Sequence, residues 1–249
     1  MQSTAQKPRT LITGAGRRIG AMLAEHLAAA GHDLVLHYHQ SGMEAQTLAK
    51  QLRAQYGADV ALVQADLAAP EMLANFWRDL PPCTALIHNA SQFTRDTLAD
   101  FTPEALRAHL AVHLESPLML TQGFMAQLPT DHSQASIIVL TDGTMGWSVA
   151  PQFFSYAISK QAWHSAIDIL AAAVAPHARA NVIALGPTLM GATDNETTFA
   201  HLAERAPLKR TNAPIEVAQA IDYLLIAPGV TGQVLSLANG FGLNSARPV

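Results

Sequence analysis

The sequence predicts a single α/β domain spanning residues 1–249, with a doubly wound parallel sheet and helices on both of its faces. Short β-type runs alternate with helical patterns along the chain, and no linker, repeat or low-complexity segment divides it. A chain of 249 residues with 49% hydrophobic and 14% charged residues can cover such a sheet on both sides. Residues 1–8 are expected to be a flexible N-terminus.

The expected elements follow one another at short intervals. Apolar, β-type runs predict strands at residues 9–13, 33–37, 60–64, 85–88, 136–141, 180–185 and 233–237. Apolar residues at helical spacing lie between them, and the two longest helices are expected at about 102–128 and 153–175. Residues 186–212 lack a clear period, so we expect them to form a mobile flap over the substrate.

Charge and composition argue against several classes of protein. Fifteen Lys and Arg against 19 Asp and Glu give a net charge of −4, which argues against nucleic acid or an anionic membrane as the main partner. The N-terminal residues have no apolar core of a signal peptide, and no apolar run is long enough to span a bilayer. Cys83 is the single cysteine, so no internal disulfide is possible. We expect a cytoplasmic protein with a small-molecule substrate and no metal.

Residues 13–20 read T-G-A-G-R-R-I-G, directly after an apolar strand and at the start of an amphipathic helix. This is the context of a dinucleotide-binding turn in a Rossmann-like fold. Gly14 would allow the tight turn, Gly16 a close approach of phosphate, and Gly20 close packing of helix on strand. Ile19 would lie beside the cofactor, and free N–H groups at the helix start would bind the pyrophosphate. The alternative is a tight turn that binds nothing.

The end of the second strand reads H-Y-H-Q-S and contains no acid. An acid there would bind the ribose hydroxyls of NAD and repel the 2′-phosphate of NADP. Arg17 and Arg18 in the glycine turn, together with His39, Gln40 and Ser41, can supply donors to that phosphate. The sequence therefore predicts NADPH/NADP+ as cofactor, although both arginines could instead cover the surface.

Tyr156 and Lys160 form a Y-x-x-x-K pair four residues apart on an expected helix. Residues at this spacing share one helix face, so the ammonium can lower the pKa of the phenol from about 10. A tyrosine tuned in this way can donate a proton during hydride transfer. Lys160 can also bond to the nicotinamide ribose.

Taken together, these features resemble the short-chain dehydrogenase/reductase family over essentially the full chain. The resemblance implies that Asp66 and Leu67 frame the adenine and that Asn89, Ala90 and Ser91 line the cofactor. It further implies a cofactor contact for Thr141, and it places the carboxamide side of the nicotinamide against Gly186, Pro187, Thr188 and Leu189. The motifs that carry it are the glycine turn, D-L at 66–67, H-N-A-S at 88–91, Y-A-I-S-K at 156–160 and G-P-T at 186–188.

Two departures from the common family pattern are similar to pteridine reductases and to bacterial dihydromonapterin reductases. Asp142 stands near the usual catalytic serine, although it lies fourteen positions before Tyr156 rather than thirteen, and His113 stands where asparagine is usual. The resemblance implies that Phe93 stacks on a pterin ring, that Asp142, Ser91 and Tyr156 contact it, and that Asp142 and His113 act in catalysis. His113 would hold a water chain that resupplies Lys160 with protons.

The sequence therefore predicts NADPH-dependent reduction of a 7,8-dihydropterin, such as dihydromonapterin or dihydrobiopterin, to the tetrahydro form, with dihydrofolate as a further candidate substrate. One alternative is a carbonyl or 3-oxoacyl reductase of the same family. A second is a non-catalytic NADP(H)-binding sensor, and a methyltransferase would also use a glycine-rich turn. The resemblance implies a homotetramer assembled through the long helices.

Overall fold

The computed structural model describes residues 7–128, 135–144, 151–190 and 196–243. These residues contain one seven-stranded sheet in the order β3-β2-β1-β4-β5-β6-β7, in which each neighbouring pair is parallel. The predicted fold class is confirmed, and the expected strands differ from the observed ones by at most two residues at either end. The strands are β1 Arg9–Ile12, β2 Asp33–Tyr38, β3 Val60–Gln64, β4 Ala85–His88, β5 Ala135–Asp142, β6 Ala178–Leu185 and β7 Val234–Leu237.

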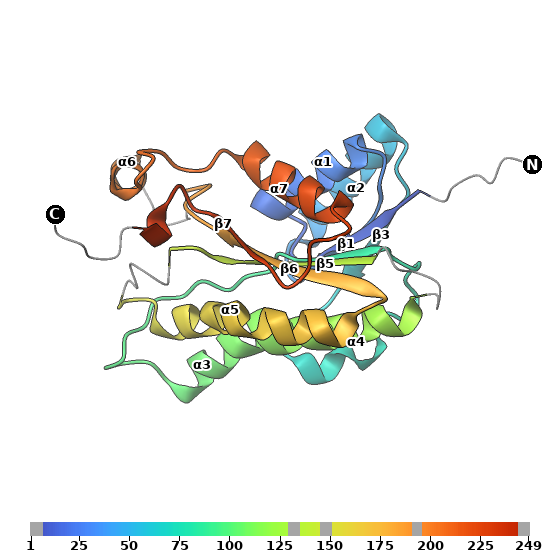
Figure 1. Cartoon of the computed structure of the whole chain (residues 1–249). Helices are drawn as coiled ribbons and strands as arrows, with labels where there is room; N and C mark the ends of the chain where they lie inside the picture. The colour runs from blue at the N-terminus through green and yellow to red at the C-terminus, as the bar shows by residue number, and fades with distance from the viewer. Residues whose placement is uncertain (1–6, 129–134, 145–150, 191–195, 244–249) are drawn as a thin grey trace, which may run out of the picture.

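Helices cover both faces of this sheet, as Figure 1 shows. The upper layer in that view holds α1 and α2 beside α7, and the lower layer holds α3, α4 and α5. The helices are α1 Arg18–Ala29, α2 Gly42–Tyr56, α3 Pro103–Leu110, α4 Ser116–Gln127, α5 Phe154–Val174, α6 Glu196–Arg205 and α7 Pro214–Ile226, with the short turns η1 Pro70–Asn75, η2 Ala111–Glu115 and η3 Phe241–Leu243. None of the described helices is long and apolar enough to cross a membrane.

Each helical layer has its own apolar core against the sheet. Trp163 of α5 and Phe124 of α4 are fully buried on one face, and Leu23 of α1 and Ile221 of α7 are fully buried on the other. Burial of such side chains contributes roughly 1.5–3 kcal/mol each to folding. Both faces must be covered because the strands of a parallel sheet are apolar on both sides.

The strand order reverses between β1 and β4, because β1 leads to β2 on one side while β4 leads to β5 on the other. Ligands of open α/β sheets bind outside the carboxyl ends of the strands at such a switch point. The glycine turn after β1, the H-N-A-S segment after β4 and the end of β5 all lie at this edge.

The structure corrects two expectations about local structure. The long helix expected at about 102–128 contains a π-helical turn, η2, at residues 111–115. The segment 186–212, expected to be a mobile flap without a clear period, contains α6. Most of the predicted flexible N-terminus and part of the predicted flap, residues 1–6 and 191–195, lie outside the described residues.

Candidate active site

The glycine turn after β1 is packed directly against the segment that follows β4. Gly14 has a φ of +64°, and a Cβ there would lie 2.9 Å from the Ala90 Cα. A Cβ at Gly20 would meet the Gly14 carbonyl oxygen. Only glycine therefore fits at these two positions, and the backbone itself forms the surface that faces the pocket.

Asn89 and Thr13 hold the two segments together. The Asn89 side chain donates to the carbonyls of Thr13 and Gly14 at 2.8 and 3.1 Å. The Thr13 hydroxyl accepts from the backbone N–H groups of Asn89 and Ala90 at 2.9 and 3.0 Å. Asn89 thus shapes the predicted phosphate-binding turn through its side chain, in addition to lining the pocket.

His37 secures the same turn from β2. Its Nδ1 accepts from the Gly14 N–H at 3.1 Å, so its Nε2 carries the proton and donates to the Ala65 carbonyl at 3.1 Å. Burial lowers the pKa of His37 to about 4, which keeps the ring neutral at physiological pH. The sequence analysis gave His37 no role, because a histidine inside an apolar strand carries no signal of its own.

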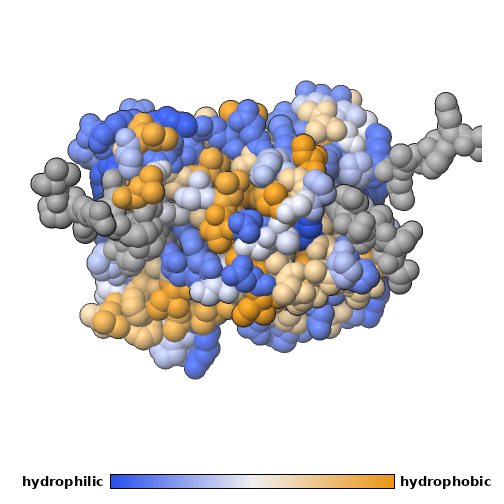
Figure 2. Space-filling view, in the orientation of Figure 1, coloured by the Kyte–Doolittle hydropathy of each residue, from blue (hydrophilic) through white to orange (hydrophobic). Residues whose placement is uncertain are grey.

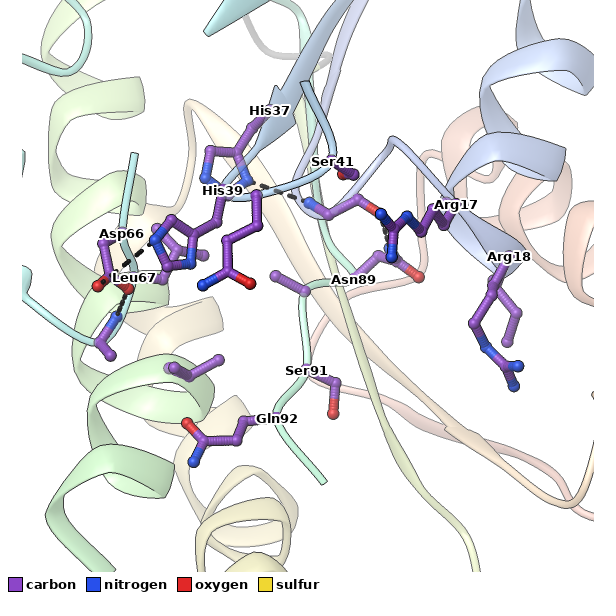
Figure 3. Close-up of a pocket in the computed structure, with 17 residues that line it drawn as sticks. Arg17, Arg18, His37, His39, Ser41, Asp66, Leu67, Asn89, Ser91 and Gln92 are labelled. Atoms are coloured by element: carbon purple, nitrogen blue, oxygen red, sulfur yellow. Dashed lines mark hydrogen bonds and ion pairs between the residues drawn. The ribbon is translucent and has the colours of Figure 1, made fainter. Parts of the chain in front are cut away.

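A cavity of about 640 Å³ lies at this edge of the sheet, and Figure 3 shows its walls. Most of the predicted cofactor residues line it, which is the fit expected for a dinucleotide. The lining residues that were predicted are Gly14, Arg17, Arg18, Ile19, His39, Gln40, Ser41, Asp66, Leu67, Asn89, Ala90 and Ser91. Those that sequence reasoning did not assign to the cofactor are Gly20, His37, Ala68, Gln92 and Val112.

The two arginines of the turn point in different directions. Arg17 pairs with Glu44 of α2 at 2.5 Å. Arg18 donates to the carbonyls of Leu189 and Met190 at 3.3 and 2.8 Å, and Figure 3 places it across the pocket from His39. Arg18 therefore does not form the expected phosphate clamp with Arg17 in this structure, because its guanidinium is used at the base of the predicted flap.

Glu44 is an acid near the pocket that lies outside the strand-two segment on which the prediction of NADP was based. It stands on α2, beyond the strand end where acids of NAD enzymes are expected, and the fold brings it to Arg17. Both side chains are largely solvent-exposed, so this ion pair is weak and a bound phosphate can compete for Arg17.

Tyr156 stands in the first turns of α5 with its hydroxyl on Asp142. The hydroxyl donates to Asp142 Oδ2 at 3.2 Å, and Thr144 donates to Asp142 Oδ1 from its N–H and hydroxyl at 2.8 and 2.6 Å. Strand β5 stays paired with β6 through Asp142 and Leu185, and the next N–H, of Gly143, donates to Leu185. The fourteen-residue spacing is therefore compatible with contact between Asp142 and Tyr156.

The electrostatic setting of Tyr156 differs from the expected one. Burial raises the pKa of Tyr156 well above 10, and the nearby Asp142 carboxylate raises it further. Lys160 donates to the Leu140 carbonyl at 3.0 Å, and its Nζ is 6.0 Å from the centre of the Tyr156 ring. Burial lowers the pKa of Lys160 to about 8. The expected lowering of the Tyr156 pKa by Lys160 is thus wrong for this arrangement, and the phenol stays protonated.

Two phenylalanines form an aromatic platform beside this hydroxyl. Phe93 and Phe153 stack with ring centres 4.3 Å apart, and the Tyr156 ring meets Phe93 edge-on at 4.8 Å. Phe153 is buried, whereas Phe93 is 54% exposed. Phe93 is therefore not a core aromatic, and its exposed surface is available to a flat ligand.

His113 has partners on both ring nitrogens. Nδ1 bonds to the Ser159 hydroxyl at 2.8 Å, and Nε2 accepts from the Gln92 N–H at 3.0 Å beside the Ser91 hydroxyl at 3.1 Å. No ring nitrogen is left to hold a water chain to Lys160. This corrects the role expected for His113, since the ring is committed to fixed contacts on two neighbouring segments.

The predicted nicotinamide side lies where β6 ends. Thr188 donates to the Gly186 carbonyl at 2.9 Å, and Asn212 N–H donates to the Pro187 carbonyl at 2.8 Å. The Thr141 hydroxyl donates to the Lys160 carbonyl at 2.8 Å and so fixes α5 on β5.

A second, largely apolar cavity of about 430 Å³ opens beyond the end of β6, lined by Thr188, Leu189, Met190, Glu196, Phe199, Ala200, Ala203 and Thr211. Among the described residues, no cluster of ligands suits a metal ion.

Comparison with known proteins agrees with this architecture. Residues 14–242 match the family model described as enoyl-(acyl carrier protein) reductase. The chain is 30% identical to the uncharacterized oxidoreductase YmfI of Bacillus subtilis, with 93% of this chain and 97% of that protein aligned. It is 28% identical to the dihydromonapterin reductase of Enterobacter sp. (strain 638) over the whole of both chains.

Solved structures give the same picture. FolM alternative dihydrofolate reductase 1 from Brucella canis, complexed with NADP, superposes with a TM-score of 0.86 at 31% identity, over 97% of this chain and 96% of that one. A single domain with a glycine turn, a Y-x-x-x-K pair and this sheet order defines the class of nicotinamide-dependent oxidoreductases. The chain belongs to the short-chain dehydrogenase/reductase family.

Proposed function

We propose that this protein is an oxidoreductase that uses NADPH to reduce a 7,8-dihydropterin to its tetrahydro form. One observation carries the proposal: the Asp142 carboxylate, at the end of β5, accepts a hydrogen bond from the Tyr156 hydroxyl beside the exposed ring of Phe93. The 28% identity to dihydromonapterin reductase and the NADP complex of the Brucella canis FolM protein support it.

The charge around Tyr156 favours a nitrogen over a ketone oxygen as the proton acceptor. Asp142 and burial make Tyr156 a weaker acid than a free phenol. A carbonyl oxygen is very weakly basic and needs a strong acid beside it, whereas the C=N nitrogen of a dihydropterin is a much better base. Since proton transfer is efficient when donor and acceptor are matched, this site suits the imine.

NADPH, when bound in the pocket at the glycine turn, supplies the hydride that reduces the C=N carbon. The residues of this chain then have separate tasks. Phe93 orients the flat ring, and Asp142 can accept hydrogen bonds from the donors on its polar edge. Tyr156 delivers the proton to N5, directly or through a water that Asp142 orients. The Lys160 ammonium opposes the negative charge left on Tyr156.

NADPH oxidation assayed with dihydromonapterin, dihydrobiopterin and dihydrofolate, and in parallel with simple ketones and a 3-oxoacyl thioester, tests the proposal. We expect turnover with at least one dihydropterin and a marked loss in Asp142→Ser. Turnover restricted to the thioester would identify a 3-oxoacyl reductase instead. Cofactor binding with no turnover of any substrate would favour the sensor. The same assay decides whether the longer tail of dihydrofolate is accepted.

We further propose that residues 186–212 close over the bound substrate.

We also propose that the protein is a homotetramer. Figure 2 shows apolar residues over α5 in the lower half of the molecule. Ile169 on α5 is 73% exposed, and Ile158 and Leu118 are 42% and 40% exposed. Exposed apolar residues of this kind are typical of an interface between subunits. Light scattering on the wild type and on Ile169→Asp tests the assembly. The cytoplasmic location stays a prediction.

A further inference from the structure

A chain of hydrogen bonds, part-buried at Gln92 and buried from His113 onward, connects the segment after β4 to the helix that carries Tyr156. It runs from the backbone of Gln92 through His113 to Ser159 and on to the carbonyl of Tyr156. His113 is 3% exposed and Ser159 is fully buried. Water therefore does not compete for the two bonds of Ser159, and breaking one of them would leave an unpaired buried group.

The direction of every hydrogen bond in this chain is determined. The Gln92 N–H can only donate, so Nε2 of His113 must accept and cannot carry a proton. The proton of the neutral ring is then on Nδ1 and is donated to the Ser159 hydroxyl at 2.8 Å. The Ser159 hydroxyl in turn donates to the Tyr156 carbonyl at 2.7 Å. Each polar hydrogen is used once, and the arrangement needs one particular tautomer.

The two ends of this chain carry the two halves of the proposed substrate site. Gln92 precedes Phe93 of the aromatic platform, and Ser159 lies one turn after Tyr156 on α5. His113 lies in the π-helical turn η2, and its own carbonyl accepts from the Trp163 indole of α5, which adds a second link. A π-helical turn inside an α-helix often marks a functional position.

We propose that His113 and Ser159 are positioning residues that set the distance and angle between Phe93 and the Tyr156 hydroxyl. This inference rests on the proposed function, because the platform matters only if a flat ring binds on it. The ring centres of Phe93 and Tyr156 are 4.8 Å apart, and hydride and proton transfer both depend on placing the ring within a fraction of an ångström.

Three substitutions separate the two ends of this hydrogen-bond chain. In His113→Asn the side-chain amide can replace Nδ1 but does not reach Gln92, and in His113→Gln it can replace Nε2 but not Nδ1. Ser159→Ala removes the bond to Tyr156. We expect His113→Asn to raise the KM for the dihydropterin about five- to tenfold, the effect of losing one buried hydrogen bond, with the Kd for NADPH within about twofold.

A double substitution tests whether the effect runs through the platform. If it does, the increases in KM of His113→Asn and Phe93→Ala are less than multiplicative in the double variant. His32→Gln is the control, since the His32 ring also bonds to a side-chain hydroxyl, that of Thr10 at 2.9 Å, and lies before β2 at the edge of the sheet opposite the proposed site. It should leave KM and kcat unchanged. Multiplicative effects, or a kcat loss in His113→Asn with an unchanged KM, would overturn the proposal.

A measurement that needs no substrate keeps this proposal separate from the proposed function. In protein with 15N-labelled histidine, the His113 resonance, assigned by its loss in His113→Gln, should show the Nδ1–H tautomer and should not titrate between pH 5 and 9. An Nε2–H tautomer, or a ring that titrates in this range, would refute the hydrogen-bond chain through His113. The expected tautomer together with a wild type that reduces no dihydropterin would refute the proposed function and the positioning role, while leaving the hydrogen-bond chain itself intact.

Discussion

Lys160 is held in the folded protein at a cost to stability, so replacing it with methionine should stabilise the apo enzyme and abolish turnover. The side chain is 5% exposed, and burial lowers its pKa from 10.5 to about 8. Between these two pH values the unfolded chain holds a proton that the folded chain has released. Stability therefore rises with pH in this window, and the full penalty for the charged lysine is present below pH 8.

The size of the effect follows from the shift in pKa. One pKa unit corresponds to about 1.36 kcal/mol, so the ammonium costs roughly 3 kcal/mol of stability at pH 7. Methionine removes this cost but also loses the hydrogen bond to the Leu140 carbonyl, which contributes about 1 kcal/mol. We expect Lys160→Met to be more stable than the wild type by about 2 kcal/mol at pH 7.

Urea unfolding of both proteins at pH 7 and pH 10, at matched protein concentration, measures the difference in the free energy of unfolding. The advantage of the variant should fall by about 2–3 kcal/mol between the two pH values, because the folded wild type has lost the charge at pH 10. Burial holds the pKa of Tyr156 well above 10, so the folded phenol stays protonated from pH 7 to 10 in both proteins and cancels from the difference. A difference that stays constant from pH 7 to 10, or a variant less stable at pH 7, would refute the reasoning.

Three further substitutions address the proton donor, the cofactor and the platform. Tyr156→Phe should reduce kcat by roughly 10²- to 10⁴-fold with an unchanged Kd for NADPH, and near-normal turnover would remove Tyr156 from the mechanism. Arg17→Ala should raise the KM for NADPH about tenfold and leave the KM for NADH unchanged, whereas Arg18→Ala should change the two KM values equally. The reverse pattern would contradict the orientations of the two arginines. Phe93→Ala should raise the KM for the dihydropterin about fivefold and leave the Kd for NADPH unchanged. An unchanged KM for the dihydropterin would mean that Phe93 does not contact the substrate.

The fold could be predicted because its determinants are local and repeated. Each strand is a short apolar run, and most of the helices between them show a helical period, so the alternation along the chain was sufficient to predict a parallel sheet. The π-helical turn at 111–115 could not be predicted in this way, since one additional residue in a helical turn does not disturb the apolar pattern. The helix α6 was missed because it is only ten residues long, although Phe199, Leu202 and Ala203 stand in it at helical spacing.

Within the candidate site, residues fixed by the backbone were predictable and contacts between distant side chains were not. Gly14, Asn89 and Tyr156 stand in motifs whose spacing determines where they lie. The pairing of Arg17 with Glu44, 27 positions apart in the sequence, depends on how α2 packs beside the glycine turn. Nothing in the sequence indicates such a pair, and an exposed arginine has several partners within reach.

The side chain at the end of β5, Asp142 in this protein, is the position at which this fold can favour one class of substrate over another. A serine hydroxyl there can donate a hydrogen bond to a carbonyl oxygen, whereas a carboxylate can only accept. Asp142 Oδ1 is already used by Thr144, and Oδ2, which accepts from Tyr156, keeps lone pairs for the substrate. These lone pairs match the N–H and amino donors on the edge of a pterin ring. They would repel the negative charge that develops on a ketone oxygen, so under the proposed function Asp142 would select its substrate by charge.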